Sequence, residues 1–260
     1  MRARAATILK PLATALLAAQ VMLHAAPARA DCAEITFENT RHIACRFDLA
    51  RDDIRLFWAD EKGQPLLSFL ALRNMLQKRG LALRFAMNAG MYTPAYKPAG
   101  LYVENGRELR PLNLKKGYGN FHLMPNGVFW IGEGRAGVTE SRAFARARKR
   151  LKVRFATQSG PMLVIRDRLH PRFRAASDSR KIRNGVGVMK DGKTLWFAIS
   201  RDPVNFHTFA RLFRDRLNTP DALFLDGGIS QIHAPEIPAA ASLFSFTPLG
   251  PMVAVVKKAE

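Results

Sequence analysis

Short apolar runs broken by turn-forming pairs recur along the middle of the chain. Three of them, residues 101–109, 121–131 and 186–199, carry an Asn-Gly or Asp-Gly pair. This arrangement is typical of a β-hairpin, because both residues of the pair tolerate the backbone conformations that tight turns require. A fourth run, residues 162–170, turns at Arg166-Asp167-Arg168. Repeated hairpins favour mixed or antiparallel sheets.

Two segments have the spacing of helices instead. Residues 65–79 place leucines near one face and stop before Gly80, a residue type that often follows a helix. Residues 206–217 place aromatic residues at helical spacing, with Asn205 as the N-cap. Apolar stripes of this kind pack into a core far more often than they bind a ligand. We therefore predict an α+β fold with mixed, mainly antiparallel sheets, packed helices and a cleft at the strand ends.

Residues 1–30 have the layout of a secretory signal peptide. A basic start precedes a mostly apolar run, and Ala28-Arg29-Ala30 supplies the small-residue pattern of a cleavage site. The run is too short and too often interrupted for a comfortable membrane span, and no later segment is as long. The sequence predicts a periplasmic or secreted protein without a transmembrane segment in the mature chain. Residues 31–260 contain no linker or repeat and are expected to form a single domain.

The two cysteines of the chain, Cys32 and Cys45, follow directly after the expected cleavage point. In an oxidising compartment such an isolated pair favours a disulfide over a metal site, because no second thiol or histidine pair stands at ligand spacing. We expect this disulfide to hold an N-terminal strand in place.

The chain is strongly basic, with 41 Lys and Arg residues against 21 Asp and Glu residues. Loss of residues 1–30 lowers the formal net charge from +20 to +16. An excess of this size attracts anionic partners. The densest basic run, residues 142–152, contains one aromatic residue and no nucleic-acid-binding motif, so a solvated basic face is the simpler interpretation. For an exported protein this favours a small molecule or glycan that bears phosphate, and no specific nucleic acid.

A carboxylate next to two glycines follows an apolar run near the end of the chain. Residues 223–225 lead to Asp226, Gly227 and Gly228, and Ser230 lies four residues after the acid. A strand that ends in this way places a carboxyl group beside uncovered backbone N–H groups, which suits a sugar or an anion. Taken alone, the segment is equally well explained as a strand followed by an Asp-Gly turn.

Three other segments combine an apolar run with small and polar residues in a similar way. They are Met87-Asn88-Ala89-Gly90-Met91-Tyr92, Ser159-Gly160-Pro161-Met162-Leu163-Val164 and Arg183-Asn184-Gly185-Val186-Gly187. Turn chemistry explains each one singly. In this order, and together with residues 225–230, they resemble the phosphodiester glycosidase family, which includes the animal uncovering enzyme that removes N-acetylglucosamine from a phosphodiester on lysosomal glycans. The resemblance spans roughly residues 85–232 and is closest to a small exported bacterial branch.

The resemblance implies hydrolysis of a sugar 1-phosphodiester, in which water attacks the anomeric carbon and a phosphate monoester leaves. Because this leaving group needs little protonation, positioning and charge stabilisation should contribute more to lowering the activation free energy. Asp226 is expected to act as the acid/base or to stabilise an oxocarbenium ion, and the planar fork of Arg183 is expected to clamp the phosphate. The expected substrate contacts are Asn88, Gly90, Ser159, Gly160, Asn184, Gly227, Gly228 and Ser230.

A second acid or base is less clearly marked. Asp202 and His207 follow an apolar run at 195–199, so both are candidates at the same sheet edge, although helix-start or turn polarity is the simpler explanation. No calcium-loop or zinc spacing is present, so we predict no metal ligand and no required cofactor. Asp226, Asp202 and Asn88 are nevertheless oxygen ligands of the kind that Ca²⁺ or Mg²⁺ accepts.

The chain departs from the commoner family pattern at three places. Ile229 stands where a third glycine is frequent, Gln231 stands where a second serine is frequent, and Asn184-Gly185 replaces a Thr-Ala pair. A changed loop at Ile229 is expected to alter which substrate fits. The alternative function, from another class, is a non-catalytic periplasmic protein that binds phosphorylated glycans.

Overall fold

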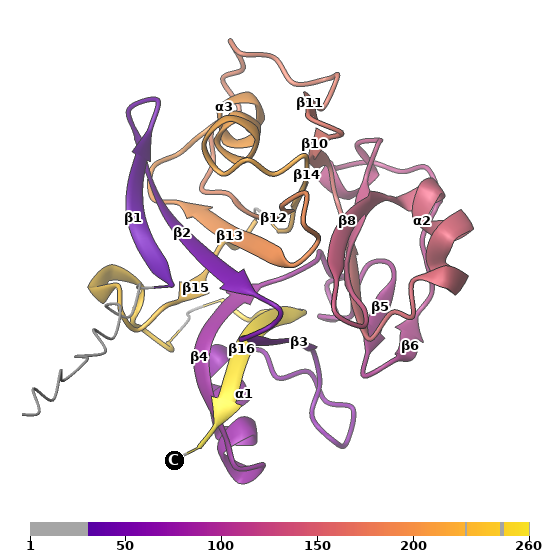
Figure 1. Cartoon of the computed structure of the whole chain (residues 1–260), viewed down its shortest axis with the longest axis vertical. Helices are drawn as coiled ribbons and strands as arrows, with labels where there is room; N and C mark the ends of the chain where they lie inside the picture. The colour runs from indigo at the N-terminus through magenta and orange to yellow at the C-terminus, as the bar shows by residue number, and fades with distance from the viewer. Residues whose placement is uncertain (1–30, 227, 245–246, 260) are drawn as a thin grey trace, which may run out of the picture.

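The computed structural model describes residues 31–226, 228–244 and 247–259. The predicted signal peptide, residues 1–30, and the predicted substrate contact Gly227 lie outside these described residues. Within the described residues, three sheets and three α-helices form one domain, which confirms the predicted α+β class (Figure 1). The cleft expected at the strand ends stays a prediction.

The strands are antiparallel to their neighbours in all three sheets. In spatial order the seven-stranded sheet contains β1 (Cys32–Phe37), β2 (Thr40–Asp48), β13 (Thr194–Ser200), β12 (Asn184–Val188), β14 (Asp221–Phe224), β10 (Met162–Ile165) and β11 (Arg168–Leu169). The four-stranded sheet contains β15 (Ile232–His233), β4 (Leu81–Asn88), β16 (Met252–Lys258) and β3 (Asp53–Phe57). The five-stranded sheet contains β6 (Arg107–Arg110), β5 (Tyr102–Glu104), β9 (Phe155–Ser159), β7 (Gly127–Ile131) and β8 (Ala136–Glu140).

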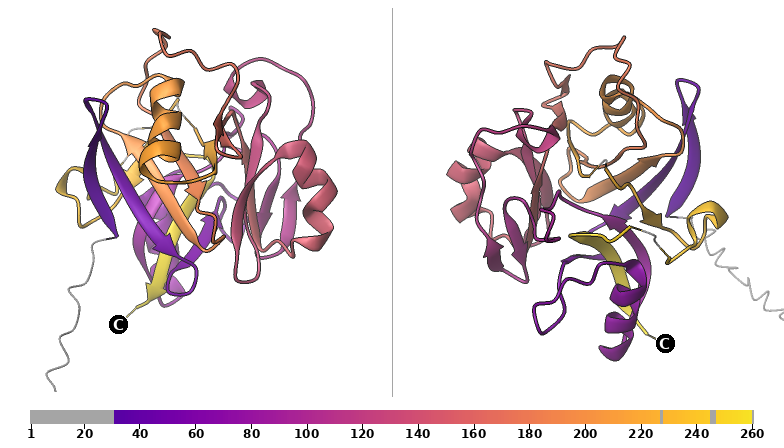
Figure 2. Two further views of the ribbon diagram at one scale, coloured as in Figure 1. Left: turned by 45° about the horizontal axis from the view of Figure 1, so that its top comes forward. Right: turned by 180° about the vertical axis from the view of Figure 1, so that it is seen from behind.

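Each sheet has one helix on its outer side (Figure 2). The helix α3 (Phe206–Arg211) covers the seven-stranded sheet, α1 (Phe69–Lys78) covers the four-stranded sheet, and α2 (Ser141–Ala147) covers the five-stranded sheet. The inner faces of the three sheets share one central core.

The alternation of side chains along β16 shows how both sides of a sheet are filled. Val253 and Val255 belong to the central core, whereas Met252 and Ala254 pack toward α1. Successive side chains of a strand point to opposite faces, so a strand with core on both sides is apolar at nearly every position. Polar side chains are therefore accommodated mainly at the ends of such strands.

Three of the four predicted hairpins are confirmed. They are β5–β6, β12–β13 and β10–β11. The hairpin predicted within residues 121–131 is wrong, because Gly127 begins β7 and the preceding residues form a short 3-10 turn, Asn120–His122. Asn126 is buried, and its Nδ2 donates to the carbonyl of Phe121 at 2.8 Å, so here the Asn-Gly pair ends a loop and starts a strand.

Both predicted helices are confirmed, with changes at their ends. The first begins at Phe69, because Ser68 is the N-cap, and Gly80 follows it with a φ of 67°. The second has Asn205 as its N-cap, as predicted, and continues beyond α3 as a π-helical turn, Leu212–Arg216. The helix α2 was not predicted, since its sequence is dominated by the basic run; Glu140 caps it by accepting two backbone N–H bonds.

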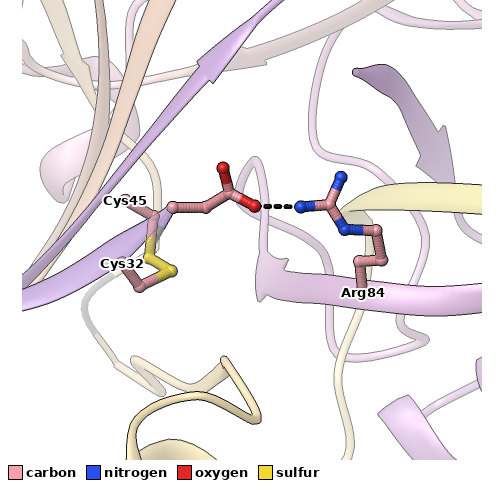
Figure 3. The surroundings of a disulfide bond; sticks show 4 residues. Cys32, Cys45 and Arg84 are labelled. Carbon is pink, nitrogen blue, oxygen red and sulfur yellow. Dashed lines mark hydrogen bonds and ion pairs between the residues drawn. A yellow bond between two sulfur atoms is a disulfide. The ribbon is translucent and has the colours of Figure 1, made fainter. Parts of the chain in front are cut away.

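The predicted disulfide joins Cys32 to Cys45 and lies across the β1–β2 pair, where the two residues are direct register partners (Figure 3). Arg84 of β4 lies nearby and is ion-paired with Asp31 and Asp52. The disulfide therefore fixes β1 to β2 at Cys32, the residue that follows Asp31 of the ion pair with Arg84.

Replacing both cysteines by serine is expected to lower the free energy of unfolding by about 2–3 kcal/mol, because the unfolded chain regains the entropy of a short closed loop. Denaturant titration of both proteins, with and without a reducing agent, measures this difference. The reducing agent should destabilise only the parent protein. Equal stability of the two oxidised proteins would contradict the assigned role.

Candidate functional site

The ends of three strands meet around Asp226. The strand β4 ends at Asn88, β12 begins at Asn184, and β14 ends at Phe224, two residues before Asp226. Since β4 belongs to the four-stranded sheet and the other two strands to the seven-stranded sheet, the site lies where two sheets meet.

Two buried amides tie the sheets together at this point. The Nδ2 of Asn184 donates to the backbone carbonyl of Asn88 at 2.8 Å and to its Oδ1 at 3.0 Å. The Oδ1 of Asn184 accepts from the backbone N–H of Asp226 at 3.1 Å, and the Nδ2 of Asn88 donates to the carbonyl of Asp226 at 3.2 Å. Both backbone polar groups of Asp226 are thus held by the two asparagines.

Further hydrogen bonds hold the residues on each side of Asp226. The hydroxyl of Ser230 contacts the carbonyl of Asp226 at 3.1 Å, and the backbone N–H of Gln231 donates to the Oδ1 of Asn88 at 2.8 Å. On the other side, the buried hydroxyl of Ser159 donates to the carbonyl of Leu225. The main chain that carries the acid is therefore fixed before and after Asp226.

The carboxyl group of Asp226 is itself lightly bonded. Its Oδ1 accepts from the backbone N–H of Gly228 at 3.1 Å, and no cation among the described residues forms an ion pair with it. Burial raises its pKa from the ordinary aspartate range, and the single N–H bond opposes this only in part. A half-buried carboxyl with a raised pKa, carried by a fixed main chain, is suited to proton transfer.

Tyr92 is a neighbour of the acid that the sequence did not nominate. Burial, and then the charge of Asp226, raise the pKa of Tyr92 to about 12. Its hydroxyl donates to the carbonyl of Pro248 at 3.0 Å, and its ring packs so closely on Gly250 that a Cβ there would lie 2.4 Å from it. Tyr92 is the last residue of the Met87–Tyr92 segment, and its place in that segment is the sequence feature that could have identified it as a site residue.

Two of the predicted substrate contacts are glycines in tight packing. A Cβ on Gly90 would lie 2.2 Å from the Oγ1 of Thr157, and one on Gly160 would lie 2.6 Å from the Cβ of Asn126. Both positions therefore require glycine for packing. Gly228, in contrast, is exposed and has room around its Cα.

Arg183 is adjacent to Asn184 in sequence, but its side chain has different neighbours. The guanidinium lies 3.6 Å from the ring centre of Phe206, and it donates to the carbonyls of Val204 at 2.8 Å and Ser179 at 2.9 Å. Burial lowers its pKa to about 10. No carboxylate within the described ranges pairs with it, so three of its five N–H hydrogens are not used by these bonds.

Neither candidate for the second acid or base forms a hydrogen bond with Asp226. Asp202 accepts two hydrogen bonds from the Arg41 side chain and one from its backbone, and these lower its pKa to about 2. Asp202 follows the end of β13, which is the strand that the sequence predicted before it. His207 lies in the first turn of α3 and is half-buried. The structure does not bring either side chain into the hydrogen-bond network around Asp226.

Two of the three departures from the family pattern take part in the site. Asn184 connects β12, Asn88 and Asp226, and Gln231 supplies a backbone N–H to Asn88. Ile229 packs toward the core beneath α1.

Within the described ranges, no three His, Cys, Asp or Glu side chains are grouped as a metal site requires. In that same part of the chain no helix is both long and apolar enough to cross a membrane.

Replacing Asn184 by alanine is expected to lower the free energy of unfolding by about 2–4 kcal/mol, because buried partners in Asn88 and Asp226 lose their bonds. Denaturant titration measures the loss. The matched control is Asn126→Ala, another buried asparagine, whose side chain bonds only to the carbonyl of Phe121 among the described residues. If Asn184→Ala has the stability of the parent protein and the same turnover, the amide of Asn184 does not hold the backbone of Asp226 in place.

The comparisons with known proteins agree with this geometry. A profile of the phosphodiester glycosidase family matches residues 82–233, more than half of the chain. The uncharacterized protein YigE of Escherichia coli (strain K12) is 37% identical over 180 residues, which are 69% of this chain and 69% of that protein.

Similar solved structures share the fold at low identity. The catalytic domain of zebrafish N-acetylglucosamine-1-phosphodiester alpha-N-acetylglucosaminidase, auto-inhibited by its pro-peptide, has a TM-score of 0.59 at 14% identity, covering 86% of this chain and 81% of that one. A hypothetical protein from Synechocystis has a TM-score of 0.54 at 11% identity, covering 86% and 61%. A putative exported protein from Burkholderia pseudomallei has a TM-score of 0.51 at 11% identity, covering 83% and 74%. All four segments that contribute to the network around Asp226 lie within the profile match, and the chain belongs to the phosphodiester glycosidase family.

Proposed function

We propose that this protein is an exported hydrolase that cleaves a sugar 1-phosphodiester bond in an envelope glycan or a related metabolite. The observation that carries the proposal is Asp226: its carboxyl group has a raised pKa, and its backbone is fixed by Asn88, Asn184 and Ser230. These residues come from the segments on which the family resemblance rests.

In the proposed reaction, water attacks the anomeric carbon and the bond from that carbon to the phosphate oxygen breaks. The electron pair of the broken bond leaves with the phosphate monoester, and the proton of the water is taken up by a base or by solvent. Asp226 acts as the acid/base, or its ionised form stabilises the positive charge that develops on the sugar. The N–H of Gly228, already bonded to Asp226, keeps the carboxyl oriented.

The remaining predicted roles are part of the same proposal. Arg183 clamps the phosphate with the N–H groups that its carbonyl partners leave unused. Asn88 has one Nδ2 hydrogen beyond the bond to Asp226 and donates it to substrate. Ser159, Gly90, Gly160, Gly227 and Ser230 shape the sugar and phosphate subsites. No cofactor is required by this scheme, and a Ca²⁺ or Mg²⁺ requirement would show as loss of turnover in a chelator.

Asp202 and His207 are the proposed sources of the second acid or base. With its pKa lowered to about 2 by Arg41, Asp202 is ionised at neutral pH and suits a base or an electrostatic role better than an acid role. His207, at the start of α3, is the other candidate for this role.

Two features support the proposed cellular location. Residues 1–30 have the pattern of a cleaved signal peptide, and Cys32 and Cys45 form a disulfide. Disulfides persist in oxidising compartments. We therefore propose a periplasmic or secreted protein.

The test is incubation of the purified protein with UDP-N-acetylglucosamine and with a p-nitrophenyl-phosphoryl sugar, followed by measurement of the released sugar. Release in the presence of a chelator and loss of release in Asp226→Asn would support the proposal. Saturable binding that Arg183→Ala weakens, without turnover by the parent protein, would instead support a non-catalytic protein that binds phosphorylated glycans.

A further inference from the structure

A cavity is lined by residues that take no part in the hydrogen-bond network around Asp226. Its volume is about 580 Å³, within the range of ligand pockets. It opens between two turns, residues 60–63 and 104–107, and Arg79 at the end of α1 lines it as well. The strands before these turns, β3 and β5, belong to different sheets. The proposed hydrolysis uses none of the residues that line this cavity.

Trp58 supplies a fixed aromatic wall. Its indole Nε1–H donates to the carbonyl of Tyr96 at 2.7 Å, and its ring meets the ring of Tyr102 edge to face with centroids 6.2 Å apart. The polar edge of the indole is thus occupied by the protein. What the half-buried ring offers the cavity is carbon surface, which stacks well against the C–H face of a sugar.

Glu104 supplies a polar group on another wall. The hydroxyl of the fully buried Tyr102 donates to its Oε2 at 2.9 Å. Burial raises the pKa of Glu104, while Tyr102, Arg79 and Arg107 oppose the rise. The carboxyl is therefore held in one orientation by a rigid partner, and it still has acceptor positions that face the cavity.

The charges that line the cavity are balanced. Asp60, Glu61 and Glu104 stand against Lys62, Arg79 and Arg107, and Arg79 is paired with Glu61 at 3.1 Å. A balanced set of donors and acceptors does not select a cation or an anion. It suits a neutral ligand that carries many hydroxyl or amide groups, each of which donates and accepts.

We propose that this cavity is a saccharide-binding site, separate from the site at Asp226, that takes one ring of an uncharged oligosaccharide against Trp58. The sugar ring stacks on the indole, and its hydroxyl groups bond to Glu104, Asn105 and the guanidinium of Arg107. The two sites share a loop, because Tyr96 holds the indole of Trp58 and lies 5.8 Å, ring to ring, from Tyr92 beside Asp226.

The test is a titration of the full mature protein with triacetylchitotriose and with maltotriose, followed by tryptophan fluorescence and by saturation-transfer NMR. We expect saturable binding of at least one of these sugars. Trp58→Ala should weaken it about tenfold or more, as expected for the loss of one aromatic face. Glu104→Gln, which keeps the size of the side chain, should weaken it by a smaller factor.

The matched control is Trp196→Phe, which removes a half-buried tryptophan of β13 and should leave the affinity unchanged. Asp226→Asn should also leave it unchanged, so this proposal and the proposed hydrolysis fail independently. The proposal is overturned if neither sugar saturates in either measurement, if Trp58→Ala binds with parental affinity, or if inorganic phosphate displaces the sugar.

Discussion

Replacing Asp226 by asparagine is expected to lower kcat for release of sugar from a glycosyl phosphodiester by about 10²–10⁴-fold, the usual contribution of a positioned acid or base. Asparagine has the same size, and its Oδ1 can still accept the N–H of Gly228, so the fold and the substrate affinity should persist. The measurement is steady-state turnover alongside a denaturation curve. A variant with parental kcat would remove Asp226 from the chemistry.

The matched control is Asp221→Asn, at the other end of β14. Burial raises the pKa of Asp221 as it does that of Asp226, and its Oδ1 accepts a backbone N–H from Arg166 at 3.0 Å. Asp221 begins β14 and Asp226 lies two residues beyond its end, so the two acids flank one strand, but only Asp226 lies among Asn88, Asn184 and Ser230. Loss of turnover in Asp226→Asn alone would assign the effect to the site.

The pH profile of the parent protein distinguishes the two roles proposed for Asp226. If the protonated carboxyl donates a proton, activity falls as pH rises through its raised pKa. If the ionised carboxylate stabilises the sugar cation or accepts a proton, activity falls as pH drops through the same value. In either case the inflection lies above the ordinary aspartate pKa and disappears in the asparagine variant.

Local sequence features predicted the parts of the fold that depend on local chemistry. The turn pairs at 104–107 and 190–193 connect antiparallel strands, and Asn205 and Gly80 lie at helix ends, because caps and tight turns involve residues close in sequence. The Asn-Gly pair at 126–127 misled the prediction, since the amide of Asn126 bonds into the core. The division of the strands into three sheets depends on distant contacts that no local pattern encodes.

The site shows the same limit. The sequence singled out Asn88, Asn184, Asp226 and Ser230 by type and position, and the structure brings them into one network. It could not show that Asn184, noted as a departure from the family pattern, is the residue that links the two sheets. Nor could it show that the guanidinium of Arg183 stacks on Phe206, because side-chain direction at a strand end depends on the helix packed above it.

Acidification from pH 7 to pH 4 is expected to destabilise the protein by up to about 3 kcal/mol for each of two buried histidines. Burial lowers the pKa of His42 and of His170 to about 4. The Nδ1 of His42 and the Nε2 of His170 are buried without a hydrogen-bond partner among the described residues. Around His42 lie Thr40, Phe209 and the charge of Asp202, which favours protonation but is outweighed by burial. Around His170 lie Phe173, the backbone of Met124 and Leu123, which favours protonation, and Arg172, whose charge opposes it; burial outweighs the backbone groups.

The direction follows from proton linkage. Between pH 6.5 and about 4 the unfolded chain binds protons at these rings and the folded chain does not, so stability is complete above pH 6.5 and is lost as pH falls toward 4. Burial also lowers the pKa of His233 and adds to this loss. The raised pKa values of Asp221, Asp226 and Glu104 act in the opposite direction and reduce the net loss. The lowered pKa of Asp202 adds a loss only below this window.

Denaturant titrations at several pH values, on the parent protein and on His42→Gln, His170→Gln and the double variant, measure the effect. Each single variant should flatten the curve in part and the double variant should flatten it most. An equally steep loss in the double variant would place the acid sensitivity elsewhere.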